Sequence, residues 1–289
     1  MIGTIREALL EASSFLAQHQ VMEPAHNAEL LLCHVLGLGR AEFFMRMTEP
    51  FPAEHDEAWH AVLARKAAGE PAQYITQEQE FYGLPFEVTP DVLIPRPETE
   101  LLVEAIVKEG RRLWPDGAPV VSDIGTGSGA IAVTLAVQCP MWQVNASDIS
   151  DAALAVAQRN AARHSAAARI DWHSGDLLAP LEGMRLDILV SNPPYIPAET
   201  IAGLQPEVRD YEPRTALDGG TDGLDPYRRM LAQLPLLAAV PRVVGFELGQ
   251  GQAREVAAWM EAAGHWDTVY IVSDYAGIER HVIAVRVQE

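Results

Sequence analysis

From residue 119 onward, short apolar runs typical of buried strands alternate with longer segments whose apolar residues have helical spacing. We expect strands at 119–124, 142–147, 169–172, 186–191, 242–247, 268–273 and 281–287. We expect helices at 129–138, 151–163, 225–238 and 251–263. This alternation predicts an α/β fold with a seven-stranded, mostly parallel sheet, because parallel strands need helical crossovers that cover both faces. In such folds, ligands bind beyond the carboxyl ends of the strands.

The residues before this alternation predict a small helical bundle. Thr4 and Glu7 have the spacing of a capping box, and about four helices follow within residues 4–68. The bundle contains no candidate catalytic cluster, so it is either a packing domain or a docking module for a partner. We favour docking, because an α/β enzyme does not need a separate bundle to fold.

The predicted domain boundaries follow from prolines and glycines that interrupt or begin secondary-structure elements. Residues 1–73 form the helical docking domain, and Pro71 marks its end. Residues 74–115 hold a β-hairpin, with its turn at Gly83-Leu84-Pro85, and a connecting helix that begins at Pro97. Residues 116–289 form the α/β domain.

The charge of the chain limits the partners that it attracts. With 21 basic and 40 acidic residues, the formal net charge is −19, which repels a phosphate backbone. The two cysteines, Cys33 and Cys139, have no metal-ligand spacing and are expected to be buried thiols of a reducing compartment. No leader-like segment and no apolar run long enough for a membrane span is visible. We therefore expect a soluble cytoplasmic protein without a membrane or direct nucleic-acid partner.

A glycine-rich turn follows the first strand of the α/β domain. Its spacing is G-x-G-x-G rather than the G-x-G-x-x-G of dinucleotide binding, which disfavours a dehydrogenase. Asp148 ends the next strand, 19 residues after Gly129, near the separation at which a carboxylate accepts ribose hydroxyls. The alternative role for Asp148 is to cap the helix that begins near Asp151, but we assign that role to Ser150.

Two further strand ends carry candidate ligand contacts. Asp176 follows the third strand, where its carboxylate could accept from an adenine amino group while Leu177 packs on the ring. The fourth strand ends in Asn192-Pro193-Pro194-Tyr195, and its two prolines fix φ and remove two backbone donors. This Asn-Pro-Pro-Tyr segment is either a stiff turn or a rigid set of hydrogen-bond acceptors beside a cofactor pocket.

Together these strand ends resemble those of the class I S-adenosylmethionine-dependent methyltransferases, which have a Rossmann-like sheet. Within that class, Asn-Pro-Pro-Tyr marks enzymes that methylate planar, amide-like nitrogens. Further segments are similar to the release factor glutamine methyltransferases, and with the helical front they span nearly the whole chain. These segments are Phe81-Tyr82-Gly83, Leu93 to Glu100, Tyr211 to Gly220, Asp222-Gly223-Leu224 and Glu247 to Gln250.

The resemblance implies a substrate, a cofactor and a set of site residues. The substrate would be the glutamine of the Gly-Gly-Gln motif of class 1 peptide chain release factors, and the cofactor S-adenosyl-L-methionine. The implied cofactor-binding residues are Gly125, Thr126, Gly127, Ser128, Gly129, Asp148, Asp176, Leu177 and Asn192. Family members often have an aromatic residue at the position of Leu177, so we expect apolar contact there rather than stacking. The glutamine site would be Asn192, Pro193, Pro194 and Tyr195, with Asn192, Pro193 and Tyr195 catalytic.

An amide nitrogen is a poor nucleophile, because its lone pair is delocalised into the carbonyl. The Asn192 side-chain oxygen and the Pro193 carbonyl could each accept one amide N–H, while the Tyr195 ring stacks on the amide plane. Two rival functions remain: an adenine-N6 nucleic-acid methyltransferase, and a non-catalytic nucleotide-binding scaffold for translation factors. The roles of Arg96, Glu98 and Arg214 stay open between substrate contact and structural support.

Overall fold

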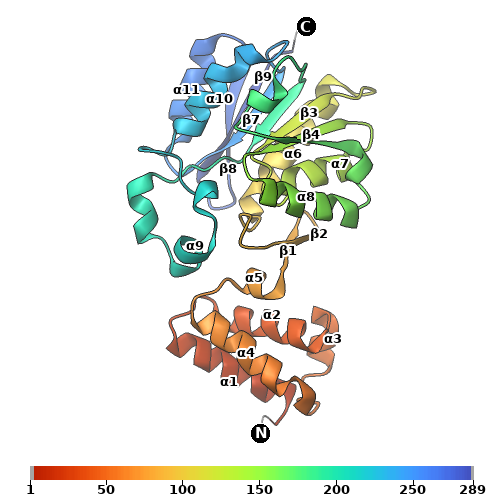
Figure 1. Ribbon diagram of the computed structural model, residues 1–289, viewed down its shortest axis with the longest axis vertical. Coiled ribbons are helices and arrows are strands. Elements are labelled where there is room, and N and C mark those ends of the chain that lie inside the picture. The colour runs from red at the N-terminus through yellow and green to blue at the C-terminus, as the bar shows by residue number, and fades with distance from the viewer. Residues whose placement is uncertain (1–2, 288–289) are drawn as a thin grey trace. The chain divides into compact units, whose positions relative to one another are not determined.

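The predicted seven-stranded sheet is present in the computed structural model, which describes residues 3–287 (Figure 1). Its strands are β3 (Val120–Ile124), β4 (Gln143–Asp148), β5 (Ile170–Ser174), β6 (Ile188–Ser191), β7 (Val243–Glu247), β8 (Thr268–Ser273) and β9 (Glu279–Val285). The spatial order is β5-β4-β3-β6-β7-β9-β8. The first five strands in this order pair in parallel, and β9 pairs antiparallel with both β7 and β8. The prediction of a mostly parallel α/β sheet is confirmed.

Helices cover both faces of this sheet, as the alternation predicts (Figure 1). One face packs against α6 (Pro97–Leu113), α7 (Ala130–Gln138) and α8 (Asp151–Arg163), and the other against α10 (Asp225–Gln233) and α11 (Ala253–Ala263). Successive strand residues alternate between the two cores: Ile188 and Val190 belong to the first, and Leu189 to the second. This period of two is what a strand buried on both faces requires.

Two predicted elements differ from the structure for local reasons. The helix expected to run to residue 238 ends at Gln233, because Pro235 lacks the N–H that would continue it, and a 3₁₀ turn follows. The hairpin turn lies at Tyr82-Gly83, one residue earlier than predicted, between β1 (Glu78–Phe81) and β2 (Leu84–Glu87). Both turn residues have left-handed φ values, 53° and 73°, as a two-residue hairpin turn of type I′ requires.

The helical front is confirmed and forms its own core around residues such as Leu16, Leu31 and Phe43, which are fully buried. The predicted capping box is present, since Glu7 N donates to Thr4 Oγ1 at 3.2 Å and Thr4 N donates to Glu7 Oε2 at 2.7 Å. Its helices are α1 (Ile5–Gln18), α2 (Pro24–Leu36), α3 (Arg40–Met45), α4 (Asp56–Ala67) and α5 (Ala72–Thr76). A short 3₁₀ helix, Ala53–His55, precedes α4, and those elsewhere are Ala167–Arg169, Ala179–Leu181, Ala198–Gly203, Arg214–Ala216 and Leu234–Leu236.

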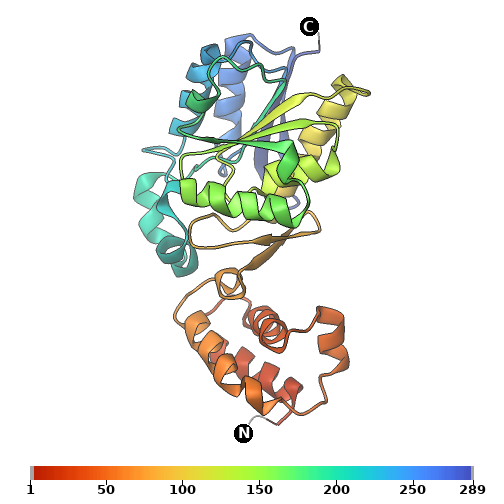
Figure 2. The ribbon, with the colours of Figure 1, turned by 45° about the vertical axis from the view of Figure 1, so that its right-hand side comes forward.

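Two compact units divide the chain (Figure 2). The helical unit extends through Glu78 and also takes in Gln205–Tyr211, which holds α9 (Pro206–Tyr211). The second unit consists of residues 79–204 and 212–289, so it includes the hairpin after its first residue and α6. Among residues 3–287, no helix combines the length and the apolar character that crossing a membrane requires.

A partly buried ion pair links α9 to the rest of the helical unit. The Lys66 side chain on α4 is fully buried, and its Nζ lies 2.6 Å from Glu207 Oε1 on α9. The same ammonium donates to the Glu70 carbonyl oxygen at 3.2 Å. A buried charge is costly unless it is paired and hydrogen-bonded, so α9 supplies the carboxylate that makes a lysine at this position tolerable.

We expect Glu207→Ala to lower the free energy of unfolding of the helical unit by roughly 2–3 kcal/mol, because it leaves the Lys66 ammonium buried without its carboxylate. Urea unfolding followed by hydrogen exchange of α4 amides measures the change. The double variant Lys66→Met, Glu207→Gln removes both charges and should recover most of the loss. Equal stability of Glu207→Ala and the parent chain would contradict a stabilising role for the pair.

Candidate active site

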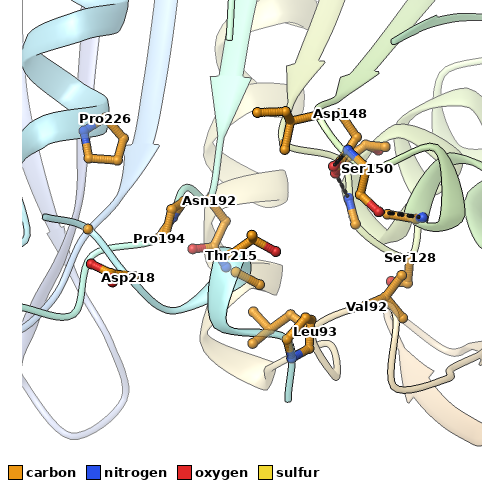
Figure 3. Close-up of a pocket in the computed structure, with 18 of the residues that line it drawn as sticks. Val92, Leu93, Ser128, Asp148, Ser150, Asn192, Pro194, Thr215, Asp218 and Pro226 are labelled. Atoms are coloured by element: carbon orange, nitrogen blue, oxygen red, sulfur yellow. Dashed lines mark hydrogen bonds between the residues drawn. The ribbon is translucent and has the colours of Figure 1, made fainter. Parts of the chain in front are cut away.

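A cavity of about 620 Å³ lies at the carboxyl ends of β3, β4, β5 and β6, where a ligand site was predicted (Figure 3). Figure 3 shows Asp148 and Ser150 across the cavity from Pro194 and Asp218, with Asn192 between them. Of the predicted site residues, those that line it are Gly125, Thr126, Gly127, Ser128, Asp148, Asp176, Leu177, Asn192 and Pro194. Gly129, Pro193 and Tyr195 are not part of its lining.

The glycine-rich turn leaves room for a ligand. Gly125 and Gly127 have φ values of 72° and 55°, and a Cβ at either position would meet no atom within 4 Å. Both glycines therefore combine a left-handed backbone with open space on the cavity side. Gly129 has a different role, because a Cβ there would come within 3.0 Å of the Ala157 Cβ on α8. The third glycine allows α7 and α8 to pack closely.

Asp148 connects two of the turns that line the cavity. Its Oδ2 accepts from Gly127 N and its Oδ1 from Ser150 N, both at 2.9 Å (Figure 3). Burial raises the pKa of this carboxyl above its ordinary value, while these amide donors act in the opposite direction. Ser150 caps α8 as predicted, since its Oγ accepts from Ala153 N at 3.2 Å. Each carboxylate oxygen of Asp148 has a second lone pair, so the carboxylate can still accept ribose hydroxyls.

Asp176 and Leu177 follow β5 and line the same cavity. The Asp176 carboxylate pairs with the guanidinium of Arg229 on α10, a partner that the sequence does not reveal. Leu177 has a φ of 51°, which turns the backbone sharply after the strand, and its side chain packs against the core under α10 and α11. The arrangement offers one carboxylate and one apolar side chain to a ligand.

Asn192 is the polar side chain at the end of β6. Its Nδ2 donates to Thr99 Oγ1 on α6 at 3.1 Å. Its Oδ1 is buried and has no hydrogen-bond partner. Buried acceptors are normally satisfied, so an unpaired one beside a cavity indicates a place for a donor that arrives with a ligand.

The remaining residues of the Asn-Pro-Pro-Tyr segment differ in their surroundings. Pro193 is buried and Tyr195 is half-buried, with its ring packed against the core under α10 and α11. Burial and the nearby Glu247 raise the pKa of the Tyr195 phenol to about 12, so it stays neutral at physiological pH. The predicted stacking of this ring on a substrate amide stays a prediction.

A loop of glycines supports the Asn-Pro-Pro-Tyr segment from behind. A Cβ at Gly219 would lie 2.8 Å from the Pro194 carbonyl oxygen. A Cβ at Gly223 would collide with the Tyr195 carbonyl oxygen. The Gln252 side chain fixes the same stretch, since its Nε2 donates to Tyr195 O at 2.9 Å and its Oε1 accepts from Gly249 N at 2.8 Å. These contacts hold a segment whose two prolines have no backbone N–H to donate.

The sequence left the role of Arg96 open, and sequence reasoning missed other residues that line or build the site. Arg96 lines the cavity and donates to both carboxylate oxygens of the buried Glu212, at 2.6 and 2.8 Å. Thr215 and Asp218 also line it. The sequence held a signal for most of these residues, because they fall within segments that carry the family resemblance. It held no signal for their contacts, because these join positions far apart in the chain.

Asp123, the last residue but one of β3, is fully buried beneath the glycine-rich turn. Its Oδ2 accepts from Thr126 Oγ1 at 2.6 Å and from Ala132 N at 3.1 Å, whereas its Oδ1 has no partner. Burial raises the pKa of this carboxyl to about 7, and the Thr126 and Ala132 donors oppose that rise. Asp123 thus ties the turn to the first turn of α7.

Solved structures with a similar fold include methyltransferases. The hMettl16 catalytic domain, solved in complex with the MAT2A 3′UTR hairpin 6, has a TM-score of 0.55 at 17% identity over 79% of this chain and 82% of that one. A methyltransferase from Pyrococcus furiosus has a TM-score of 0.50 at 18% identity over 77% of this chain and 96% of that one. At these identities the likeness shows the fold alone. Fold and cavity together agree with the predicted class of S-adenosylmethionine-dependent methyltransferases.

Sequence comparisons narrow this class. The family model for the methyltransferase small domain matches residues 97–203, and that for the PrmC N-terminal domain matches residues 7–76. A release factor glutamine methyltransferase from Moorella thermoacetica is 45% identical over 99% of this chain and 100% of its own length. One from Geobacter sulfurreducens is 45% identical over 97% of this chain and 96% of its own length. The chain belongs to the release factor glutamine methyltransferase family, as the sequence motifs predicted.

Because burial raises the pKa of Asp123 to about 7, the folded state binds this proton more tightly than the unfolded chain does. The contribution of Asp123 to stability is therefore greatest at low pH and is lost as the pH rises through about 7. Asp123→Asn keeps an acceptor for Thr126 and carries no charge. We expect the stability of this variant minus that of the parent chain to be larger at about pH 8 than at about pH 4, because only the parent must bury a charge at the higher pH.

Urea-unfolding midpoints of both proteins across this pH range, without cofactor, test the expectation. A difference in midpoint that is independent of pH would show that the Asp123 pKa is not raised in the folded state.

Proposed function

We propose that this protein transfers a methyl group from S-adenosyl-L-methionine to the side-chain amide nitrogen of the glutamine in the Gly-Gly-Gln motif of class 1 peptide chain release factors. The observation that carries the proposal is the buried, unpaired Oδ1 of Asn192 beside the cofactor cavity. It leaves one acceptor open for an N–H donor at the end of β6. Near-full-length identity to release factor glutamine methyltransferases supports glutamine as that donor.

The cavity fits the cofactor. Gly125 and Gly127 provide open space for close backbone approach, Asp148 provides acceptors for ribose hydroxyls, and Asp176 with Leu177 is proposed to flank the adenine. The proposed cofactor set also includes Thr126, Ser128 and Asn192, with Gly129 acting through helix packing. When bound, S-adenosylmethionine supplies the electrophilic methyl group.

The chain's own contribution is to orient a weak nucleophile. A primary amide carries two N–H groups, and the Asn192 Oδ1 and the Pro193 carbonyl are the proposed acceptors, one for each. Accepting both N–H groups fixes the nitrogen and increases its electron density without a strong base. The two prolines, the Gly219–Gly223 loop and Gln252 hold these acceptors, so little reorganisation is needed during the reaction.

The helical unit is proposed to dock the release factor. It has its own core and exposes large apolar side chains at Phe44 and Met45 of α3, which are 49% and 76% exposed. Side chains of this kind are enriched at protein interfaces. Because release factors act in translation, we place the reaction in the cytoplasm.

Two rival functions differ in the molecule that is methylated. An adenine-N6 methyltransferase could use the same acceptors for an exocyclic amine, but a net charge of −19 disfavours capture of nucleic acid. A scaffold would bind the cofactor and transfer nothing. Family membership favours glutamine over both.

Intact-mass analysis of a class 1 release factor, after incubation with this protein and S-adenosylmethionine, tests the proposal. We expect a gain of one methyl group, localised by peptide fragmentation to the Gly-Gly-Gln glutamine. A release factor with alanine in place of that glutamine is the control. Label from radioactive cofactor entering DNA or RNA instead would favour the adenine rival, and cofactor binding without any transfer would favour the scaffold.

Asn192→Ala should lower the turnover number on release factor by about 10²-fold or more, because it removes an acceptor that orients the reacting nitrogen. Cofactor affinity, measured by calorimetry, should change far less. Asn145→Ala is the matched control, since Asn145 is a buried asparagine of β4, separated from β6 by β3, that does not line the cavity. Near-normal turnover of Asn192→Ala would rule out the proposed role.

A further inference from the structure

Thr99 provides the side-chain contact that anchors the Asn192 amide. The two residues are 93 positions apart, and Asn192 Nδ2 donates to Thr99 Oγ1 at 3.1 Å. Thr99 is only 4% exposed, and it lines the same cavity. The hydroxyl therefore acts in a water-poor environment, where a hydrogen bond constrains geometry more strongly than it does at the surface.

The unpaired Oδ1 makes this anchor necessary. A buried acceptor without a partner costs free energy, so the amide would gain by rotating until Oδ1 met a neighbouring donor. The bond to Thr99 opposes partial rotation, because any smaller turn of the amide would break it, and a complete flip would require the Thr99 hydroxyl to turn and donate to Oδ1. In the observed arrangement the hydrogen bond is made by Nδ2, and Oδ1 stays available to a ligand.

Thr99 is itself well fixed. It lies in the first turn of α6, where its backbone N–H donates to the Arg96 carbonyl oxygen at 3.1 Å. Leu102, Val103 and Ile106 on the same helix are fully buried in the core against the sheet. A threonine in a helix is restricted mainly to two χ1 rotamers, which limits the positions of its hydroxyl relative to β6.

We propose that Thr99 is a positioning residue that holds the Asn192 side-chain amide in place at the end of β6, with Oδ1 free for the N–H of the substrate. This inference rests on the proposed function for its kinetic consequence. Thr99 does not touch the reacting atoms; it acts through Asn192. The inference gives a chemical reason for a threonine within the segment from Pro97 to Glu100, which a helix start alone does not require.

Two variants separate the hydroxyl from the shape of the side chain. Thr99→Val keeps the branched shape and loses the acceptor, and we expect kcat on release factor to fall about tenfold while KM changes less than about twofold. Thr99→Ser keeps the hydroxyl and should return kcat to within about threefold of the parent chain. Cofactor affinity and thermal unfolding should be similar for all three proteins. If Thr99→Val turned over at the parent rate, or Thr99→Ser were as slow as Thr99→Val, the inference would be wrong.

A measurement without turnover keeps the test independent of the proposed function. The side-chain NH₂ signal of Asn192, assigned by its loss in Asn192→Asp, should exchange slowly with water in the parent chain and in Thr99→Ser. It should exchange much faster in Thr99→Val. Equal exchange in all three would overturn the inference. A parent chain that methylates no release factor would instead overturn the proposed function, and the exchange result would still decide the role of Thr99.

Discussion

The parallel pairing of β3 with β4 on one side and with β6 on the other fixes where the strands end and which residues meet at the active site. In this register Ile124 lies opposite both Ser147 and Ser191, so three strands end at one level of the sheet. Ser191 Oγ donates to Ile124 O at 2.6 Å and fixes the level where Asn192 leaves the sheet. Because a slip by one residue would turn every side chain to the opposite face, this register also fixes which residues meet in the cavity.

The Asn-Pro-Pro-Tyr segment is rigid because several distant parts of the chain support it. Two adjacent prolines remove the donors that would tie a normal loop to its neighbours, and this leaves its carbonyl oxygens available. Gly219 and Gly223 have no Cβ, so the backbone there can approach the carbonyls of Pro194 and Tyr195 closely, and Gln252 donates a hydrogen bond to the Tyr195 carbonyl. The prolines leave the carbonyl oxygens without local partners, and the distant glycines and Gln252 hold the segment in place. Together they produce a fixed set of hydrogen-bond acceptors.

Local patterns explain how much could be predicted from the sequence. The strands and helices, the Thr4–Glu7 capping box and the Ser150 cap depend on residues a few positions apart, so periodicity and spacing reveal them. The strand ends could also be placed on one edge, because parallel topology brings them there. The bonds from Asn192 to Thr99 and from Asp176 to Arg229 could not be predicted, since residue types alone do not specify a partner far away in the chain. Only packing reveals that Gly129 allows close contact between helices and that the Tyr195 ring packs against a core.

The pairing of Lys66 with Glu207 has a consequence for how this protein can be divided. The helical unit looks like a detachable N-terminal module in the linear sequence, but its boundary is crossed three times by the chain, after residues 78, 204 and 211. A fragment that stops at the first crossing would contain the lysine without the carboxylate that compensates it. The helical front therefore reaches its complete structure only when the chain has been made well past the Asn-Pro-Pro-Tyr segment, so that synthesis and folding of the two units are linked in time.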